Sequence, residues 1–231
     1  MRAVVDAIER MIDRHGPEAV CGALEPLLTA DRIARIDEVL RNRLTSVATA
    51  VEDTYDPHNA AATMRTSEAL GLQELHVIEP GDRFSTAQGV TRGSHRWIDL
   101  FRWKSADVAV NALHARGFRV YATLPEPTAV SIEDVDVSTP LAVIFGNEHA
   151  GLSPTAIAAA DGAVTVPMFG FTESYNLSVT VGLAMSRLAA RRRAHLGAPG
   201  DLDPGRKARL RARWFAIRIR AAVQIVDRAL G

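Results

Sequence analysis

The chain has 231 residues, with 27 basic and 27 acidic side chains, so its formal net charge at pH 7 is zero. A composition of 47% hydrophobic and 23% charged residues excludes a disordered, collagen-like or coiled-coil protein. No apolar run approaches the roughly 20 residues that a membrane-spanning helix needs, and the N-terminal stretch lacks the apolar centre of a signal peptide. We therefore expect a globular, cytoplasmic protein with no membrane partner.

Several chemical classes lose support from missing motifs. The single cysteine, Cys21, allows no internal disulfide and no cysteine-clustered zinc site, and its apolar surroundings predict a buried, inert thiol. The chain lacks GxGxxG, GxxxxGK[ST] and GxSxG, so dinucleotide, P-loop and serine-hydrolase readings are not supported. Glu148 and His149 are adjacent, with no third ligand at a helical or hairpin spacing, so we predict no metal site.

The first 46 residues predict helices over 2–14, 17–28 and 31–43, with Asp31 as the N-cap of the third. From residue 44 onward, short apolar runs alternate with helical stretches. Strands are expected at 46–51, 75–78, 118–123, 141–145 and 163–167, and helices at 59–70, 107–116, 154–160 and 176–193. The pattern predicts an α/β fold with a mainly parallel sheet of five or six strands. Residues 81–103 fit neither pattern and predict a long loop with a short strand.

The domain prediction follows from these changes in pattern. It comprises a helical N-terminal extension (1–46), an α/β domain (47–193) and a C-terminal segment (194–231), in which a turn-rich hinge at 197–205 precedes one basic helix. The zero charge is unevenly distributed: residues 187–231 carry twelve basic and three acidic side chains, a net of +9, and the remainder carries −9. Such a tract predicts a polyanion partner, although a solvated arginine face on an amphipathic helix explains it equally well.

Three loops follow predicted strands, and open parallel sheets bind ligands at the carboxyl ends of their strands. The loop 53–65 contains Asn59 and Arg65, which could face one cleft or be a helix cap and a solvent-exposed cation. The loop 145–151 places Gly146 and Glu148 at a strand end. The loop 166–176 contains Ser174 and Asn176, where an N-cap serine is the alternative reading.

Together these loops resemble the three motifs of the SPOUT superfamily of RNA methyltransferases, specifically its TrmH branch. Motif one matches PHNAAATMRTSEALG with Asn59 and Arg65, motif two matches LAVIFGNEHAGLS with Gly146 and Glu148, and motif three matches VPMFGFTESYNLSVT with Ser174 and Asn176. The segment TRGSHRW (91–97) also resembles a Gly-Ser-His-basic-Trp segment of the branch. The resemblance spans residues 32–193.

The resemblance implies a C-terminal trefoil knot, S-adenosylmethionine as methyl donor, a homodimer, and transfer to a ribose 2′-hydroxyl. Carried over residue by residue, the cofactor contacts fall on Thr123, Gly146, Val166 and Tyr175. The layout with both terminal extensions is similar to the members that methylate the D-loop guanosine of tRNA. Ribosomal RNA methylation and a non-catalytic RNA-binding module are the alternatives.

For the chemistry, the catalytic candidates are Asn59, Arg65, Glu148, Ser174 and Asn176. A guanidinium deprotonates only above about pH 12, so we expect Arg65 to hold a nucleotide phosphate and to stabilise the developing alkoxide. Ser174 and Asn176 are expected to position the ribose, and Glu148 to orient Asn59 or the knot backbone. The basic C-terminal tract is expected to contact the RNA backbone.

Overall fold

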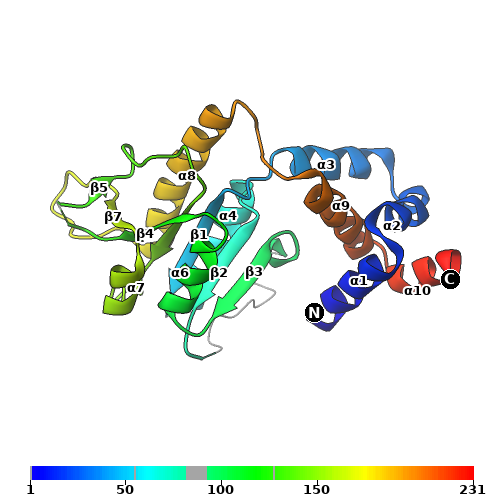
Figure 1. Ribbon diagram of the computed structural model, residues 1–231, viewed down its shortest axis with the longest axis horizontal. Helices are drawn as coiled ribbons and strands as arrows, with labels where there is room; N and C mark the ends of the chain where they lie inside the picture. The colour runs from blue at the N-terminus through cyan, green and yellow to red at the C-terminus, as the bar shows by residue number, and fades with distance from the viewer. Residues whose placement is uncertain (1, 55, 82–92, 127) are drawn as a thin grey trace. The chain divides into compact units, whose positions relative to one another are not determined.

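The computed structural model describes residues 2–54, 56–81, 93–126 and 128–231, and it divides into two compact units (Figure 1). One unit consists of residues 1–43 together with 200–231, and the other of residues 44–199. Both terminal segments thus belong to a single helical unit, and the boundaries of the central unit lie a few residues outside those expected. No helix in the described part of the chain is long and apolar enough to cross a bilayer.

The helical unit begins with α1 (Arg2–His15), α2 (Pro17–Leu24), the 3-10 turn η1 (Glu25–Leu27) and α3 (Ala30–Arg41). Gly16, at φ 80°, separates α1 from α2, and Pro17 occupies the first position of α2, where its missing N–H leaves no hydrogen bond unmade. The N-cap of α3 is Thr29, whose side chain accepts a hydrogen bond from the Arg32 amide. The expectation that Asp31 caps this helix was therefore wrong, because Asp31 lies inside its first turn.

The C-terminal segment folds as two helices, α9 (Pro204–Arg218) and α10 (Ala222–Leu230), and the single basic helix expected there was wrong. The chain turns between them at Ala221, which has φ 59°. Helix α9 packs against α1, α2 and α3 and buries Leu210, Trp214 and Phe215. Helix α9 is thus the central helix of this unit, and these apolar residues of the basic C-terminal tract contribute to the core of the unit.

The second unit contains a seven-stranded sheet in the order β3-β2-β1-β6-β4-β7-β5, in which every pairing is parallel. The strands are β1 (Val47–Glu52), β2 (Glu74–Ile78), β3 (Asp99–Trp103), β4 (Arg119–Thr123), β5 (Val130–Ser131), β6 (Leu141–Phe145) and β7 (Gly162–Thr165). The predicted parallel α/β fold is confirmed, with β3 as the short strand expected within 81–103. The two-residue edge strand β5 was missed, because so short a segment has no readable alternation.

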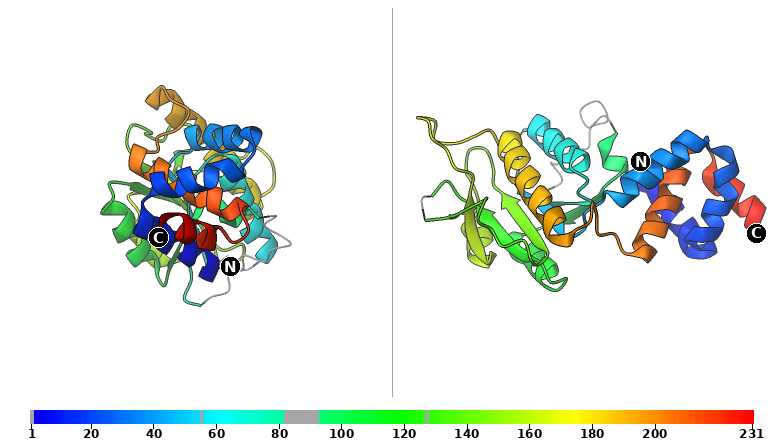
Figure 2. Two further views of the ribbon diagram at one scale, coloured as in Figure 1. Left: turned by 90° about the vertical axis from the view of Figure 1, so that its right-hand side faces the viewer. Right: turned by 90° about the horizontal axis from the view of Figure 1, so that it is seen from above.

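Helices cover both faces of this sheet. One face carries α4 (Pro57–Ala69) and α8 (Leu177–Leu196), which lie side by side in Figure 2, and the other carries α6 (Ala106–His114) and α7 (Pro154–Ala159). The alternation of β1 shows the division, since Val47 and Val51 pack with α4 and α8, whereas Ala48 and Ala50 face α6 and α7. The 3-10 turn η2 (Ser94–Arg96) packs against α4.

The strand order brings the candidate loops together. Strands β1, β6, β4 and β7 are neighbours in the sheet and run in one direction, so their carboxyl ends lie along one edge. The three motif loops leave this edge from β1, β6 and β7, and the segment after β4 begins at Thr123. The trefoil knot implied by the resemblance stays a prediction.

Candidate active site

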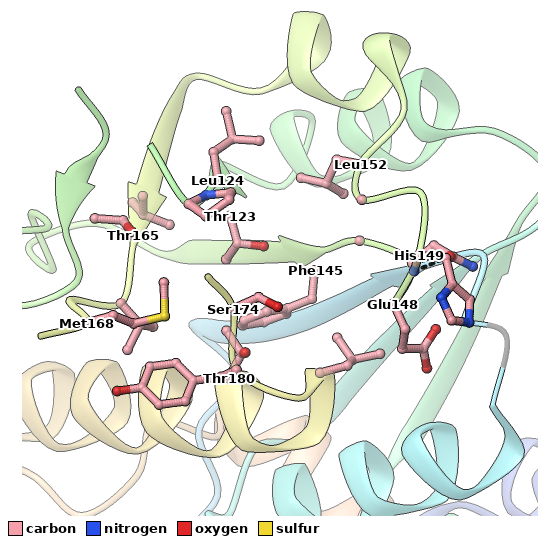
Figure 3. Close-up of a pocket in the computed structure, with 18 residues that line it drawn as sticks. Thr123, Leu124, Phe145, Glu148, His149, Leu152, Thr165, Met168, Ser174 and Thr180 are labelled. Carbon is pink, nitrogen blue, oxygen red and sulfur yellow. Dashed lines mark hydrogen bonds between the residues drawn. The ribbon is translucent and has the colours of Figure 1, made fainter. Parts of the chain in front are cut away.

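A cavity of about 310 Å³ opens at this edge of the sheet (Figure 3). Glu148 and His149 lie at one end of it and Met168 at the other. Its lining comes from the segments after β4, β6 and β7 and from the start of α8: Thr123, Leu124, Pro125, Phe145, Gly146, Asn147, Glu148, His149, Gly151, Leu152, Val164, Thr165, Val166, Met168, Ser174, Tyr175, Leu177 and Thr180. The volume lies at the lower end of the range for small-molecule sites.

Gly146 forms a wall of the cavity at which no side chain fits. A Cβ atom on Gly146 would lie 2.4 Å from the carbonyl carbon of Gly151 and 2.5 Å from the amide nitrogen of Leu152. Both are backbone atoms, which cannot rotate away as the end of a flexible side chain can. The turn after β6 therefore folds back directly onto the backbone of Gly146, a close approach that only glycine allows.

A chain of side-chain hydrogen bonds joins the three motifs. The Asn59 amide nitrogen donates to Glu148 Oε1 at 2.8 Å, and the Asn176 amide nitrogen donates to Asn59 Oδ1 at 3.2 Å. Asn176 Oδ1 in turn accepts from the Ser178 amide at 2.9 Å and so caps α8. The orientation of Asn59 is thus fixed from both sides, and the contact between Glu148 and Asn59 is the one that the sequence suggested.

Two cap interpretations were wrong. Asp56 caps α4, accepting from the His58 amide at 2.8 Å, whereas Asn59 lies in the first turn and is only 8% exposed. Ser174 does not cap α8, because that position belongs to Asn176. Buried polar side chains in an otherwise apolar layer must find partners, and Asn59 finds them in the other two motifs.

The structure places the remaining predicted residues in two groups. Six of them line the cavity: Thr123, Gly146, Glu148, Val166, Ser174 and Tyr175. Arg65 does not line it and lies exposed on α4. Six residues at about 100° each put the side chains of Asn59 and Arg65 roughly 120° apart around α4, and their placement in one cleft stays a prediction.

Sequence reasoning missed several residues around the cavity. Met168 and Thr180 line it, and the Asn147 side chain accepts a hydrogen bond within the turn after β6 and donates one to the Asp53 carbonyl after β1. The buried carboxylate of Glu52, at the end of β1, accepts hydrogen bonds from the amide and the hydroxyl of Ser153 at 2.8 and 2.7 Å. An acidic residue closing an apolar strand was the one signal in the sequence that could have drawn attention to Glu52.

Much of the basic tract has partners inside the protein. In α9, Arg209 donates to Glu9 at 2.8 Å and to Asp13 at 2.7 Å, and Arg211 donates to Asp37 at 2.7 Å. The hydrogen bond to Asp13 raises the pKa of Arg209, and the one to Asp37 raises the pKa of Arg211. Carboxylates from the N-terminal helices therefore neutralise charge that the sequence alone assigns to a binding surface.

The arginines at the end of α8 also have hydrogen-bond partners inside the protein. Arg191 donates to the carbonyl oxygens of Ile132 and Val135 at 2.9 and 2.6 Å, and Arg192 is buried and donates to the Val137 oxygen at 2.7 Å. These guanidinium groups satisfy carbonyl groups of the segment after β5. They support the fold and are poorly placed to bind a polyanion.

Comparison with known proteins identifies the family. A profile described as the SpoU rRNA Methylase family matches residues 46–186, more than half of the chain. The chain belongs to this family.

Individual SpoU relatives agree with the assignment. The chain is 37% identical over 194 residues to the tRNA (guanosine(18)-2′-O)-methyltransferase of Borreliella burgdorferi, covering 84% of this chain and 88% of the relative. Among solved structures, it resembles the A. aeolicus TrmH/SpoU tRNA modifying enzyme with a TM-score of 0.73 and 26% identity, over 82% of this chain and 98% of that one. The AdoMet-bound rRNA methyltransferase from Sinorhizobium meliloti matches with a TM-score of 0.57 and 26% identity, over 68% and 60% of the two chains.

Proposed function

We propose that this SpoU family member transfers a methyl group from S-adenosylmethionine to the ribose 2′-hydroxyl of the D-loop guanosine of tRNA. The observation that supports it most is the cavity, which gathers all four cofactor-contact candidates and borders the hydrogen-bonded chain of Asn59, Glu148 and Asn176. The B. burgdorferi relative, which is named for guanosine 18 of tRNA, supports this choice of substrate. The match to the rRNA enzyme covers less of the chain, so ribosomal RNA is the second candidate.

The cavity suits a cofactor held largely through backbone groups. Gly146 contributes only backbone to the lining, and Val166 and Tyr175 from the segment after β7 also line the cavity. The Thr123 hydroxyl donates to the Ile144 carbonyl at 2.8 Å, which fixes the threonine beside the strand ends. When bound, S-adenosylmethionine supplies a methyl group on a sulfonium, which makes the carbon electrophilic.

The residues of this chain then have separable roles. Arg65 lies exposed outside the cavity of its own chain, and its proposed role is to bind a phosphate of the RNA through its planar guanidinium. Its proposed stabilisation of negative charge on the attacking oxygen requires that the bound RNA or a second copy of the chain bring this oxygen and Arg65 together. Ser174, at the cavity wall, positions the ribose, while Glu148 and Asn176 hold Asn59 in one orientation. Alignment of the hydroxyl with the methyl carbon provides much of the acceleration in such an in-line displacement. The O–C bond would form as the S–C bond breaks, S-adenosylhomocysteine would leave, and we propose a phosphate of the substrate as the acceptor of the hydroxyl proton.

The homodimer is part of this proposal. Phe169 and Phe171 are fully exposed, and Tyr175, Val179 and Leu183 follow at four-residue intervals with 40%, 47% and 41% exposure. A repeat of four residues places these last three along one side of α8 and the turn before it. Exposed apolar side chains of this kind mark protein contacts, and a second copy of the chain is the partner that we propose.

Contact with the RNA backbone is proposed for those cations of the basic tract whose position allows it. Arg220 and Arg228 are exposed near the C-terminus, and Lys207 is half-buried in the first turn of α9. Lysine and arginine contacts to phosphate give affinity without base identity. A tRNA substrate also supports the cytoplasm as the location.

The direct test measures tritiated methyl transfer to total tRNA and to ribosomal RNA, followed by mapping of the modified nucleotide. Methylation of a D-loop guanosine in tRNA is expected, and exclusive labelling of ribosomal RNA would select the second candidate. Calorimetry with S-adenosylmethionine distinguishes an enzyme from a non-catalytic RNA-binding module. Absence of cofactor binding at millimolar concentration would contradict the proposed function.

A further inference from the structure

The turn that follows β6 is organised by the side chain of Asn147. Its Oδ1 atom accepts hydrogen bonds from the amides of His149 and Ala150 at 2.8 and 3.0 Å. The backbone closes the same turn, since Asn147 and Gly151 exchange two hydrogen bonds at 2.9 and 3.0 Å. One end of the Asn147 amide group therefore fixes the shape of residues 147–151.

The other end of the same amide group contacts a different strand. Asn147 Nδ2 donates to the carbonyl oxygen of Asp53 at 2.6 Å, across 94 residues of sequence. Asp53 is the first residue after β1, its amide donates to the Ile78 carbonyl at 2.8 Å, and its φ is 48°. This left-handed conformation is uncommon for a non-glycine residue, although aspartate adopts it more readily than most, and the bond from Asn147 is one of the contacts made by Asp53 in this conformation.

The hydrogen bond from Asn147 to Asp53 is important because the two sequence neighbours of Asn147 belong to the site. Gly146 on one side forms the backbone wall of the cavity, and Glu148 on the other accepts the hydrogen bond from Asn59. Asp53, which Asn147 contacts, lies three residues before Asp56, the N-cap of α4, and α4 carries Asn59. A displacement of Asn147 thus moves the cavity wall and both partners of the Asn59–Glu148 contact at once.

We propose that Asn147 is a positioning residue that couples the loop after β1 to the turn after β6, so that Gly146 and Glu148 are aligned for cofactor binding and methyl transfer. The relation to methyl transfer rests on the proposed function. The coupling between the two loops does not, because it can be measured in the protein without cofactor or RNA.

The variant Asn147→Asp isolates the link. Its carboxylate keeps both acceptor contacts within the turn, but it replaces the donor with an oxygen that faces the Asp53 carbonyl. Asn111→Asp is the matched control, because Asn111 is exposed on α6 and the change in size and charge is the same. Asn147→Ala removes all three contacts and serves as the second variant.

Three measurements are expected to change in N147D and not in N111D. In N147D the hydrogen of the Asp53 amide exchanges with solvent at least tenfold faster, while the amides of His149 and Ala150 stay protected. In N147A these two amides lose their protection. The dissociation constant for S-adenosylmethionine rises about tenfold, a change of about 1.4 kcal/mol, and kcat falls while KM for tRNA stays within about twofold. N147A is expected to lose cofactor affinity at least as strongly.

Unchanged exchange at Asp53 in N147D overturns the coupling, and unchanged cofactor affinity overturns its role in the site. A fall in thermal stability without either effect also overturns the proposal, since it indicates a purely structural residue. Failure of the wild-type protein to bind S-adenosylmethionine contradicts the proposed function instead, and the exchange of the Asp53 amide then decides the coupling by itself.

Discussion

Substitution of Gly146 by alanine tests the cavity wall most directly. The added Cβ would lie 2.4, 2.5 and 2.6 Å from three backbone atoms of Gly151 and Leu152. Ordinary carbon contacts lie near 3.5–4.0 Å, so the turn after β6 must move by roughly 1 Å. Overpacking of this kind typically costs about 1–3 kcal/mol. We expect residues 146–151 to be displaced, because this displacement relieves most of the clash.

The consequence is measured by calorimetric titration with S-adenosylmethionine. A wall displaced by roughly 1 Å is expected to weaken binding at least about tenfold, since each tenfold corresponds to about 1.4 kcal/mol. Gly22→Ala is the control, because Gly22 lies within α2, no atom outside the local backbone of that helix and the two chain neighbours lies within 4 Å of its Cβ position, and alanine there favours the helix. Wild-type affinity in G146A would refute the assignment of this wall to the cofactor site.

Three further predictions concern other parts of the chain. Arg65→Lys keeps the charge but loses the planar donor fork, so the methylation rate is expected to fall about tenfold or more; a full rate with unchanged RNA binding would remove the bidentate role. Arg220→Ala is expected to reduce the slope of log affinity for tRNA against log salt by somewhat less than about one unit. The guanidinium of Arg209 already binds carboxylates, so Arg209→Ala is expected to leave this slope unchanged and to lower thermal stability. Equal changes of slope in the two variants would contradict this division. Burial raises the pKa of Asp161, but the hydrogen bonds it accepts, including one from His114, give a net lowering, so its contribution to stability is present above the usual aspartate range and is lost as pH falls through the folded-state pKa. Asp161→Asn is therefore expected to lower the melting temperature at pH 7 and to match the wild type in strong acid, and an equal loss at both pH values would show that charge is not the cause.

The sequence could not show which basic side chains of the C-terminal tract are paired with carboxylates. The count of +9 after residue 186 was correct, but the count ignored where carboxylates of distant segments lie. Arg209 and Glu9 are 200 residues apart, and their contact exists because α9 packs against α1. Part of the positive charge after residue 186 is therefore neutralised by carboxylates within the helical unit.

The contacts of Asn59 at the site could also not be predicted from the sequence. The spacing of Asn59 and Arg65 identified the motif, and the Asp-Pro pair before Asn59 gave the real start of the helix, which was overlooked. Its partners Glu148 and Asn176 lie 89 and 117 residues away. No local pattern could show that a single amide group joins them.

The sequence by itself determined the parallel α/β class, most strand positions and the motif residues, because these depend on periodicity and on turn chemistry over a few residues. Only the tertiary structure decided which polar side chains meet. The strand order placed the carboxyl ends of β1, β6, β4 and β7 side by side, and this neighbourhood created the contacts of Asn147 with Asp53 and of Glu148 with Asn59. Hydrogen bonds between residues some ninety positions apart follow from packing, and packing is a property of the whole chain.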